Sequence, residues 1–383
     1  MKIRDFFKSK PSIHVLDDKE IDVALEATDE SQDVAGSPKP SKKQKASEAL
    51  KGPIGLDIGT ANIVVAQNRG KDIRALRQLN AFFTIPYSNI TKRTLLRDEV
   101  IFFEKDKKLY VLGYSAEGFA NTFGGSTRKP IESGLLNPKE NESISVIRAI
   151  ISQFIQEPQK KDEKICFSVP GEPIDRPASV VFHESIIRMH LKSLGYSPIP
   201  INEGLAVILS ELSSNNFTGI GISMGGGMCN VCFAYLSVPV ITYSIQKGGD
   251  YIDSMVGSSI GESPTKVKEI KEEGLDLTVE PKDRVEIGLH VFYDDLFSSL
   301  VKSLQQVLGS SDNIPRLSMA VPIVLSGGTV IPRGSREKFE KALSDIRLPI
   351  RVSEIIIAQK PLYSGHDRRK RDIDGSFCNR LFS

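Results

Sequence analysis

The sequence predicts an α/β protein made of two similar halves around a cleft. Two glycine-rich segments, far apart in the chain, support this prediction: GLDIGTAN at residues 55–62 and GISMGGGM at residues 221–228. Each follows a short apolar stretch, turns on glycine and continues into a second β-like run, IVVA or VCFA. Helical and extended patterns alternate through the rest of the chain, as is typical of α/β folds. One hairpin used twice therefore indicates two related lobes.

In the first half, the elements follow from hydrophobic periodicity and from turn residues. We expect strands at residues 54–58, 63–67, 100–104, 109–112, 165–169 and 199–202. The run VIFFEKDKKLYVL predicts a hairpin that turns at Asp106 and Lys107. We expect helices at residues 142–155, 183–194 and 205–212, the second of them ended by Gly195.

The second half repeats this alternation. Its glycine hairpin covers residues 219–234, and further strands are expected at residues 238–245, 323–325 and 350–352. Helical patterns lie at residues 251–255, 265–272, 292–308 and 336–346. Two α/β halves, each opened by a glycine hairpin, would face each other and could clamp a ligand between them.

Composition separates two terminal tails from the folded body, and the two similar α/β halves divide that body. Residues 1–52 are first acidic and then rich in Ser, Pro and Lys, which predicts a disordered tail because such a segment buries too little apolar surface. We assign residues 53–204 to lobe I and residues 205–345 to lobe II. Residues 346–365 are expected to return to lobe I, and residues 366–383 form a basic tail.

The bulk properties are those of an ordinary globular protein. The 383 residues are 40% hydrophobic and 26% charged, and the formal net charge of +2 favours no class of partner. Residues 1–12 lack the apolar core of a signal peptide, and no apolar run approaches the roughly 20 residues that span a bilayer. We therefore expect a cytoplasmic protein. Cys229 and Cys232 form a C-x-x-C pair, but no second pair completes a metal site, so we expect core cysteines.

The glycine turns are suited to phosphate. Glycine lets backbone N–H groups approach an anion closely, and a carboxylate beside phosphates can handle a metal ion or its waters. The first segment has Asp57 at this position and the second has Ser223. Taken alone, each turn also fits a purely structural role, because neither matches the P-loop or the dinucleotide-binding fingerprint.

Together, the motifs resemble those of the actin and heat-shock ATPase superfamily, and most closely those of the MreB-type bacterial actins. The family's first phosphate motif, D-[LI]-G-T-A-N, matches at Asp57, Ile58, Gly59, Thr60, Ala61 and Asn62. The second motif, D-I-G-G-G-T-T, matches only as Gly225, Gly226 and Gly227. The third is VLSGGTVIPRG, which contributes Gly327 and Gly328. The resemblance implies an actin-like ATPase fold with two lobes around a nucleotide cleft.

Other landmarks agree in order with this family, from about residue 53 to residue 365. RKPIESGLL and KGGDYIDSMV are similar to segments near the family's cleft. INEGLAVILSEL is similar to a helix start whose acid orients the attacking water, which assigns that role to Glu203. VKEIKEE is similar to a helix beside adenine and ribose, so Lys268, Lys271 and Glu272 become candidate nucleotide contacts.

The resemblance implies ATP and Mg2+ as cofactors. The amides of the two hairpins would hold the phosphates, Asp57 would bind Mg2+ through water and, with Glu203, take part in catalysis, and Gly327 and Gly328 would lie against adenine. Four residues depart from the second motif: Ser223, Met228, Cys229 and Asn230 stand where the family has an acid, two threonines and another acid. Losing one such positioning group commonly costs about 100-fold in rate, so we expect ATP binding with slow hydrolysis.

Two functions remain open, and the first is the leading hypothesis because of the close motif match at Asp57 to Asn62 and the small insert in the first lobe. The first is an MreB-like, ATP-binding cytoskeletal or scaffold protein that assembles into filaments with its nucleotide state. The second is a non-polymerising actin-fold adaptor that recruits protein partners to a membrane-associated assembly. The family's strand-bearing outer subdomain of lobe II is reduced here to GLDLTVEPKDRVEIGLHV, which favours the adaptor. A metabolite kinase ranks below both, because no inserted substrate domain is visible.

The termini offer candidate contacts. In MKIRDFFKSK, at residues 1–10, Ile3, Phe6 and Phe7 share one helical face beside basic residues, which would suit peripheral contact with the inner face of the membrane. A frayed terminus is the alternative. The run RRKR at residues 368–371 is typical of a solvated tail, and nothing indicates a specific nucleic acid partner.

Overall fold

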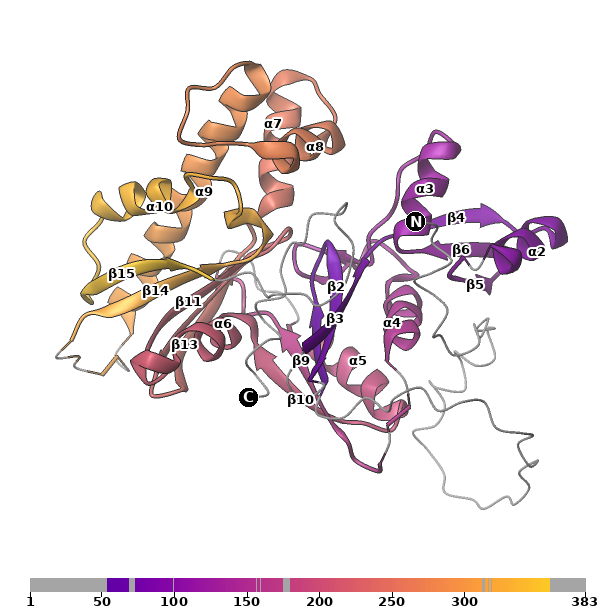
Figure 1. Cartoon of the computed structure of the whole chain (residues 1–383), viewed down its shortest axis with the longest axis horizontal. Helices are drawn as coiled ribbons and strands as arrows, with labels where there is room; N and C mark the ends of the chain where they lie inside the picture. Colours follow the sequence, from indigo (N-terminus) through magenta and orange to yellow (C-terminus); the bar gives the residue numbers. More distant parts are fainter. Residues whose placement is uncertain are drawn as a thin grey trace.

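Two five-stranded sheets with identical strand order form the framework (Figure 1). The computed structural model describes residues 54–68, 73–98, 100–155, 157–158, 160–174, 180–311, 314–315, 317 and 319–358. The expected tails, with the candidate membrane segment at residues 1–10 and the basic run at residues 368–371, lie outside the described residues. No described helix is long and apolar enough to cross a membrane.

The first sheet has the order β3-β2-β1-β9-β10. Its strands are β1 (Ile54–Ile58), β2 (Asn62–Asn68), β3 (Ile73–Leu79), β9 (Lys164–Val169) and β10 (Ser197–Asn202). The first three pair antiparallel, while β9 runs parallel to β1 and β10 parallel to β9. Helices α4 (Ser143–Phe154) and α5 (Val180–Ser193) contribute apolar side chains to its core.

The second sheet repeats the first, in the order β13-β12-β11-β14-β15. Its strands are β11 (Gly219–Met224), β12 (Cys229–Tyr235), β13 (Val238–Ile245), β14 (Val321–Ser326) and β15 (Val352–Ile357). Strands β11, β12 and β13 pair antiparallel, while β14 runs parallel to β11 and β15 parallel to β14. The predicted α/β architecture with two similar lobes is therefore confirmed.

Helices cover the second sheet with a separate apolar core. They are α7 (Gly249–Ile260), α8 (Pro264–Gly274), α9 (Arg284–Ser310) and α10 (Ser335–Ser344). Helix α9 begins eight residues before the predicted start at residue 292, since Asp283 caps it by accepting hydrogen bonds from the amides of Val285 and Glu286. Only residues 275–283 join α8 to α9, and they hold no strand beyond a single bridge at Asp276. The reduction of the outer subdomain in lobe II is confirmed.

One predicted segment is wrong. Residues 346–365 were expected to return to lobe I, with a strand at residues 350–352. Instead β15 starts at Val352 and pairs with β14 in the second sheet, so the described part of this segment, up to residue 358, belongs to lobe II. The apolar run of β15 adds a fifth strand to that sheet because the parallel edge of β14 would otherwise be unpaired.

The first lobe carries a small outer subdomain that pattern reading largely missed. It contains β4 (Phe82–Pro86), β5 (Phe102–Lys105) and β6 (Lys108–Leu112), with α2 (Asn89–Arg97) and α3 (Tyr114–Thr122) beside them. The predicted turn between β5 and β6 is confirmed. Asp106 and Lys107 both have positive φ, 50° and 57°, as a tight two-residue hairpin requires.

Helix α6 (Glu203–Glu211) lies between the two sheets. On one side Ala206 packs with Val64 and Ala66 of β2. On the other, Val207 and Ile208 pack with residues of β12 and β14. The predicted lobe boundary at residues 204 and 205 thus lies within a helix that contacts both lobes.

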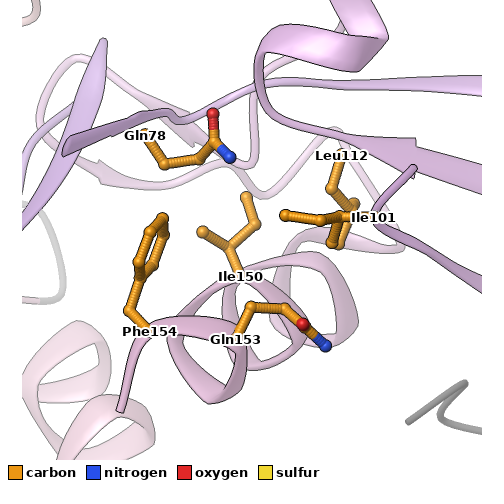
Figure 2. A pocket seen from close by; sticks show the side chains of 6 residues that line it. All are labelled: Gln78, Ile101, Leu112, Ile150, Gln153 and Phe154. Carbon is orange, nitrogen blue, oxygen red and sulfur yellow. The ribbon is translucent and has the colours of Figure 1, made fainter. Parts of the chain in front are cut away.

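A small apolar fissure between β3 and α4 is too small for a nucleotide. It leaves about 0 Å³ of space for even a water-sized molecule, whereas ligand pockets start at roughly 300 Å³. Figure 2 shows its lining: Gln78, Ile101, Leu112, Ile150, Gln153 and Phe154. The junction between the two hairpins is the better candidate site.

Candidate nucleotide-binding site

The two glycine segments form the same turn. In the first hairpin the amide of Gly59 donates to the carbonyl of Asn62 at 2.9 Å; in the second the amide of Gly225 donates to the carbonyl of Met228 at 3.0 Å. Strand register extends this equivalence. Asp57 pairs with Val64 on the neighbouring strand, and Ser223 pairs with Asn230. Asp57 and Ser223 therefore occupy equivalent positions, each two residues before the turn.

The two turns lie against each other. A Cβ placed on Gly227 would collide with Oγ1 of Thr60 and with the amide nitrogen of Gly134. A Cβ on Gly226 would lie 3.5 Å from Cβ of Ala61. Glycine is needed at position 227 because the backbones of two lobes approach closely there, whereas the contacts at Gly226 are at ordinary van der Waals distance. The structure therefore brings together the predicted phosphate-binding residues of both hairpins.

Side chains hold the first turn. Nδ2 of Asn80 donates to the carbonyl of Gly59 at 2.8 Å, and the Asn80 amide donates to the carbonyl of Ala61 at 2.9 Å. Oγ1 of Thr60 accepts the amide of Gly134 at 3.0 Å, which ties the turn to the short hairpin of β7 (Ile131–Glu132) and β8 (Leu135–Leu136). Asn80 is fully buried. Asn80 and Thr60 therefore fix this turn in place.

Ser168 orients the Asp57 carboxylate. Its Oγ donates to Oδ1 of Asp57 at 2.8 Å and accepts the amide of Ile58 at 3.0 Å. Ser168 lies near the carboxyl end of β9, the parallel strand next to β1. Sequence reasoning missed it, although ligand sites in α/β sheets commonly form at the carboxyl ends of adjacent parallel strands.

The second turn is held mainly by backbone groups of lobe II. The Gly225 carbonyl accepts the amide of Gly249 at 3.0 Å and Oγ1 of Thr329 at 2.9 Å. The Gly226 carbonyl accepts the amide of Asp250 at 2.8 Å. The turn therefore sits on the N-terminus of α7, where orphan amides need acceptors.

The third glycine motif joins this arrangement. Gly327 has φ +104°, and a Cβ there would collide with the backbone of Met224. Gly328 opens the short 3₁₀ segment Gly328–Val330, which contains Thr329. Gly327 and Gly328 thus lie directly beside the second hairpin. Contact of these glycines with adenine stays a prediction.

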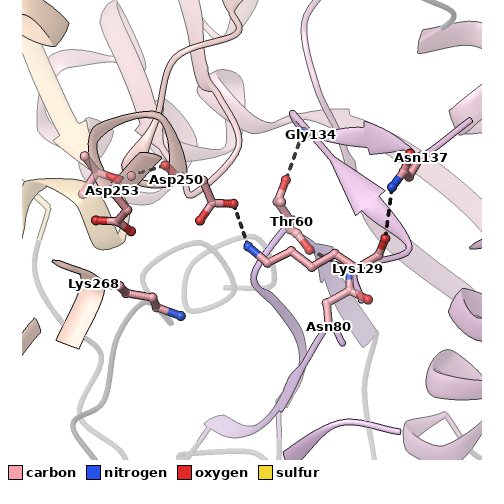
Figure 3. A network of polar contacts seen from close by, with 12 residues as sticks. Thr60, Asn80, Lys129, Gly134, Asn137, Asp250, Asp253 and Lys268 are labelled. Atoms are coloured by element: carbon pink, nitrogen blue, oxygen red, sulfur yellow. Dashed lines mark hydrogen bonds and ion pairs between the residues drawn. The ribbon is translucent and has the colours of Figure 1, made fainter. Parts of the chain in front are cut away.

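The predicted contacts on α8 have other partners in the structure. Nζ of Lys271 lies 2.6 Å from Oδ1 of Asp253 and donates to the carbonyl of Gly249 at 3.0 Å. Both side chains of this ion pair are buried; burial raises the pKa of Asp253 to about 6, while Lys271 opposes that shift. Lys271 therefore supports the start of α7. Nζ of Lys268 lies 3.9 Å from Oε1 of Glu272, and Figure 3 shows the Lys268 side chain extending from α8.

An ion pair joins the lobes beside the turns (Figure 3). Nζ of Lys129, just before β7, lies 2.7 Å from Oδ2 of Asp250 at the start of α7. Burial alone would raise the pKa of Asp250, but the charge and hydrogen bond of Lys129 lower it below its ordinary value. Both residues lie in segments that the sequence singled out, yet no sequence signal paired them.

Two neutral side chains hold Glu203. Oγ of Ser223 donates to its Oε2 at 3.0 Å, and Nδ2 of Asn230 donates to the same oxygen at 2.9 Å. Glu203 is the first residue of α6, and the carboxylate lies beside the second hairpin. Cys229 and Cys232, both fully buried in β12, are core residues as expected, and burial raises the pKa of each thiol.

The Asp57 carboxylate suits a magnesium ion that is held mostly by waters and phosphates. No group of three or more His, Cys, Asp or Glu side chains among the described residues could hold a metal ion alone. Mg2+ commonly uses one or two carboxylates, several waters and substrate phosphates. Asp57, oriented by Ser168 beside the first turn, fits that role.

Comparison with known proteins identifies the family. The model of the Volactin family matches residues 53–366. The chain belongs to the volactin family. Among curated protein sequences, none matches the chain.

Solved structures show the same fold. A MamK double helical filament has a TM-score of 0.58 and 17% identity, covering 81% of this chain and 94% of that chain. MreB 5 of Spiroplasma citri bound to AMPPNP has a TM-score of 0.56 and 15% identity, covering 81% and 92%. A non-polymerising MamK mutant bound to AMPPNP has a TM-score of 0.51 and 16% identity, covering 81% and 94%. The chain therefore has the actin-like fold of the MreB and MamK structures, as the motifs predicted.

Proposed function

We propose that this protein is an actin-like cytoskeletal or scaffold protein that binds ATP with Mg2+ between its lobes and assembles according to its nucleotide state. The observation that carries the proposal is the contact between two equivalent glycine turns, one from each lobe, at Gly227 and Thr60. Backbone amides at two such turns suit the β- and γ-phosphates. Structures with the same fold include nucleotide-bound MreB 5 and a MamK filament, which supports the proposal.

Residues of both turns would contact the nucleotide or its metal ion. The amides of Gly59 and Gly225 close the two turns, so the amides of residues 60–61 and 226–227 would bind phosphate oxygens. Thr60 would add a hydroxyl, and Asp57 would orient metal-bound water. Mg2+, when bound, would neutralise charge on the phosphate oxygens. Since the turns come from different lobes, a ligand that binds both favours the closed arrangement. Subunit affinity would then follow nucleotide state.

The test combines binding, sedimentation and phosphate release. We expect ATP and Mg2+ to bind, more protein to pellet with ATP than with ADP or no nucleotide, and phosphate to appear slowly. Asp57→Ala should weaken Mg2+-dependent ATP binding at least about tenfold, since one charged ligand contact is worth roughly 1.5–3 kcal/mol. Gly118→Ala is a matched control, because a Cβ there meets nothing within 4 Å. An Asp57→Ala protein that binds as well as the parent would sink the proposed site.

The second candidate is a non-polymerising adaptor that recruits partners to a membrane-associated assembly. The short connection at residues 275–283 favours it, because the outer subdomain of lobe II is reduced there. Nucleotide binding without pelleting at any protein concentration would select the adaptor. We also propose a cytoplasmic location with peripheral membrane contact through residues 1–10; co-sedimentation with anionic vesicles, compared between the full chain and one lacking these residues, tests it.

A further inference from the structure

Glu203 receives two hydrogen bonds from one pair of facing residues. Ser223 on β11 and Asn230 on β12 are directly opposite each other in the antiparallel ladder. Their donors meet at one oxygen, Oε2, at 3.0 and 2.9 Å. Facing side chains on one sheet surface can act on a common target. The pair therefore defines where this carboxylate lies relative to the second turn, which follows Ser223 by two residues.

Asn230 has a second bond that fixes the direction of its amide. Its Oδ1 accepts the amide of Gly171 at 2.9 Å, from the loop that follows β9 in lobe I. The Gly171 carbonyl in turn accepts Oγ of Ser244 on β13 at 2.8 Å. With an N–H donor on one side and a carboxylate on the other, only one orientation of the Asn230 amide satisfies both. Asn230 is almost completely buried; its bond to Gly171 is buried, and its bond to Glu203 is partly buried.

These contacts give a reason for two of the departures from the second phosphate motif. An acid at position 223 or 230 would place its carboxylate about 3 Å from that of Glu203, where like charges disfavour ionisation. The neutral hydroxyl and amide instead donate to the charge, and hydrogen bonds to an ionised group are the stronger kind. The second hairpin therefore has no acid at these two positions and donates hydrogen bonds to the Glu203 carboxylate of α6.

We propose that Ser223 and Asn230 are positioning residues that hold Glu203 for the hydrolysis of ATP, with neutral donors where the resembled motif has acids. This inference rests on the proposed function. Glu203 would accept a hydrogen bond from the attacking water. The water oxygen forms a bond to the γ-phosphorus while the bond between the γ-phosphorus and the β–γ bridging oxygen breaks. ADP leaves with the electron pair of that bond, and the water proton passes to phosphate or solvent. The bond to Gly171 makes this geometry depend on the contact between lobes.

The test separates turnover from binding. Phosphate release gives kcat and KM, and titration with ATP gives the affinity, for the parent and for Glu203→Gln, Ser223→Ala and Asn230→Asp. We expect kcat to fall at least about tenfold in each, with KM and affinity within about twofold, because the lost bonds reach substrate only through Glu203. Asn230→Asp keeps the acceptor for Gly171 and replaces only the donor. Ser223→Thr should restore kcat to within about threefold, because it restores the hydroxyl.

Ser303→Ala is the matched control, since Ser303 is a buried serine that bonds Tyr243 within the core of lobe II. It should leave kcat within about twofold. Unchanged kcat in Ser223→Ala would overturn the inference, and so would a parent that binds ATP and releases no phosphate. A parent that binds no ATP contradicts the proposed function itself. If Asn230→Asp does not fold, Ser223→Ala and its Thr rescue decide the question.

Discussion

The two hairpins share one turn geometry but are held in different ways. The first is held by side chains: that of Asn80 donates to the Gly59 carbonyl, and that of Ser168 donates to the Asp57 carboxylate. The second is held by backbone, because the carbonyls of Gly225 and Gly226 accept amides at the start of α7. The first hairpin thus keeps a carboxylate beside its turn, while the second is anchored to a helix and provides donors for Glu203. Two turns of the same geometry can therefore be supported by different kinds of contact in the two lobes.

The largest effect should come from breaking the support of the second hairpin. Lys271→Met removes the partner of a buried carboxylate and a donor to the Gly249 carbonyl. Because an unpaired buried charge remains, we expect a loss of about 3–5 kcal/mol in the free energy of unfolding at pH 8.

This loss should depend on pH. The pKa of Asp253 is already raised, and losing Lys271 raises it further. At pH 5 the folded variant therefore carries a protonated, uncharged Asp253, so its stability recovers as pH falls through the folded pKa. Urea unfolding at pH 5 and pH 8 measures this. An equal loss at both values would show that Asp253 is not the cause.

A smaller effect should follow from separating the two turns. Gly227→Ala adds a Cβ against Thr60 and the backbone of Gly134, so one of the two turns must shift. Overpacking of this kind costs about 1–3 kcal/mol. We expect a lower unfolding midpoint and weaker ATP binding, measured by urea titration and by calorimetry. Gly118→Ala, in open space on α3, should change neither, and parent-like binding by Gly227→Ala would mean that the turns need not touch.

The smallest effect concerns the ion pair between the lobes. Lys129 and Asp250 are each about one-third exposed, so the pair is worth no more than about 1 kcal/mol. Lys129→Met should lower the free energy of unfolding by less than that. In 0.5 M salt, the difference in this free energy between variant and parent should become smaller. The lowered pKa of Asp250 means that the pair stabilises above the ordinary value of 3.8 and loses its effect as pH falls through the lower folded pKa. Salt-independent destabilisation would point to lost packing instead.

Much of the fold follows from local sequence. Alternating apolar residues and glycine predicted both hairpins, and β13 spans residues 238–245 as expected. The outer strand β4 and helices α2 and α3 were missed because their apolar residues pack against each other, in a cluster with Leu95 and Ala116, rather than along a long periodic face. Strand β15 was expected to join the wrong lobe, because a short apolar run does not show which sheet edge it will pair with.

Of the candidate site, the sequence by itself determined the glycine turns and the contrast between Asp57 and Ser223, because backbone freedom and residue chemistry are local properties. Only the tertiary structure decided which side chains hold Glu203, that Lys271 pairs with Asp253, and that Lys129 pairs with Asp250. The last pair is 121 residues apart in the chain. Such contacts depend on how the two sheets pack around α6. The periodicity and spacing of residues within one segment do not predict that packing.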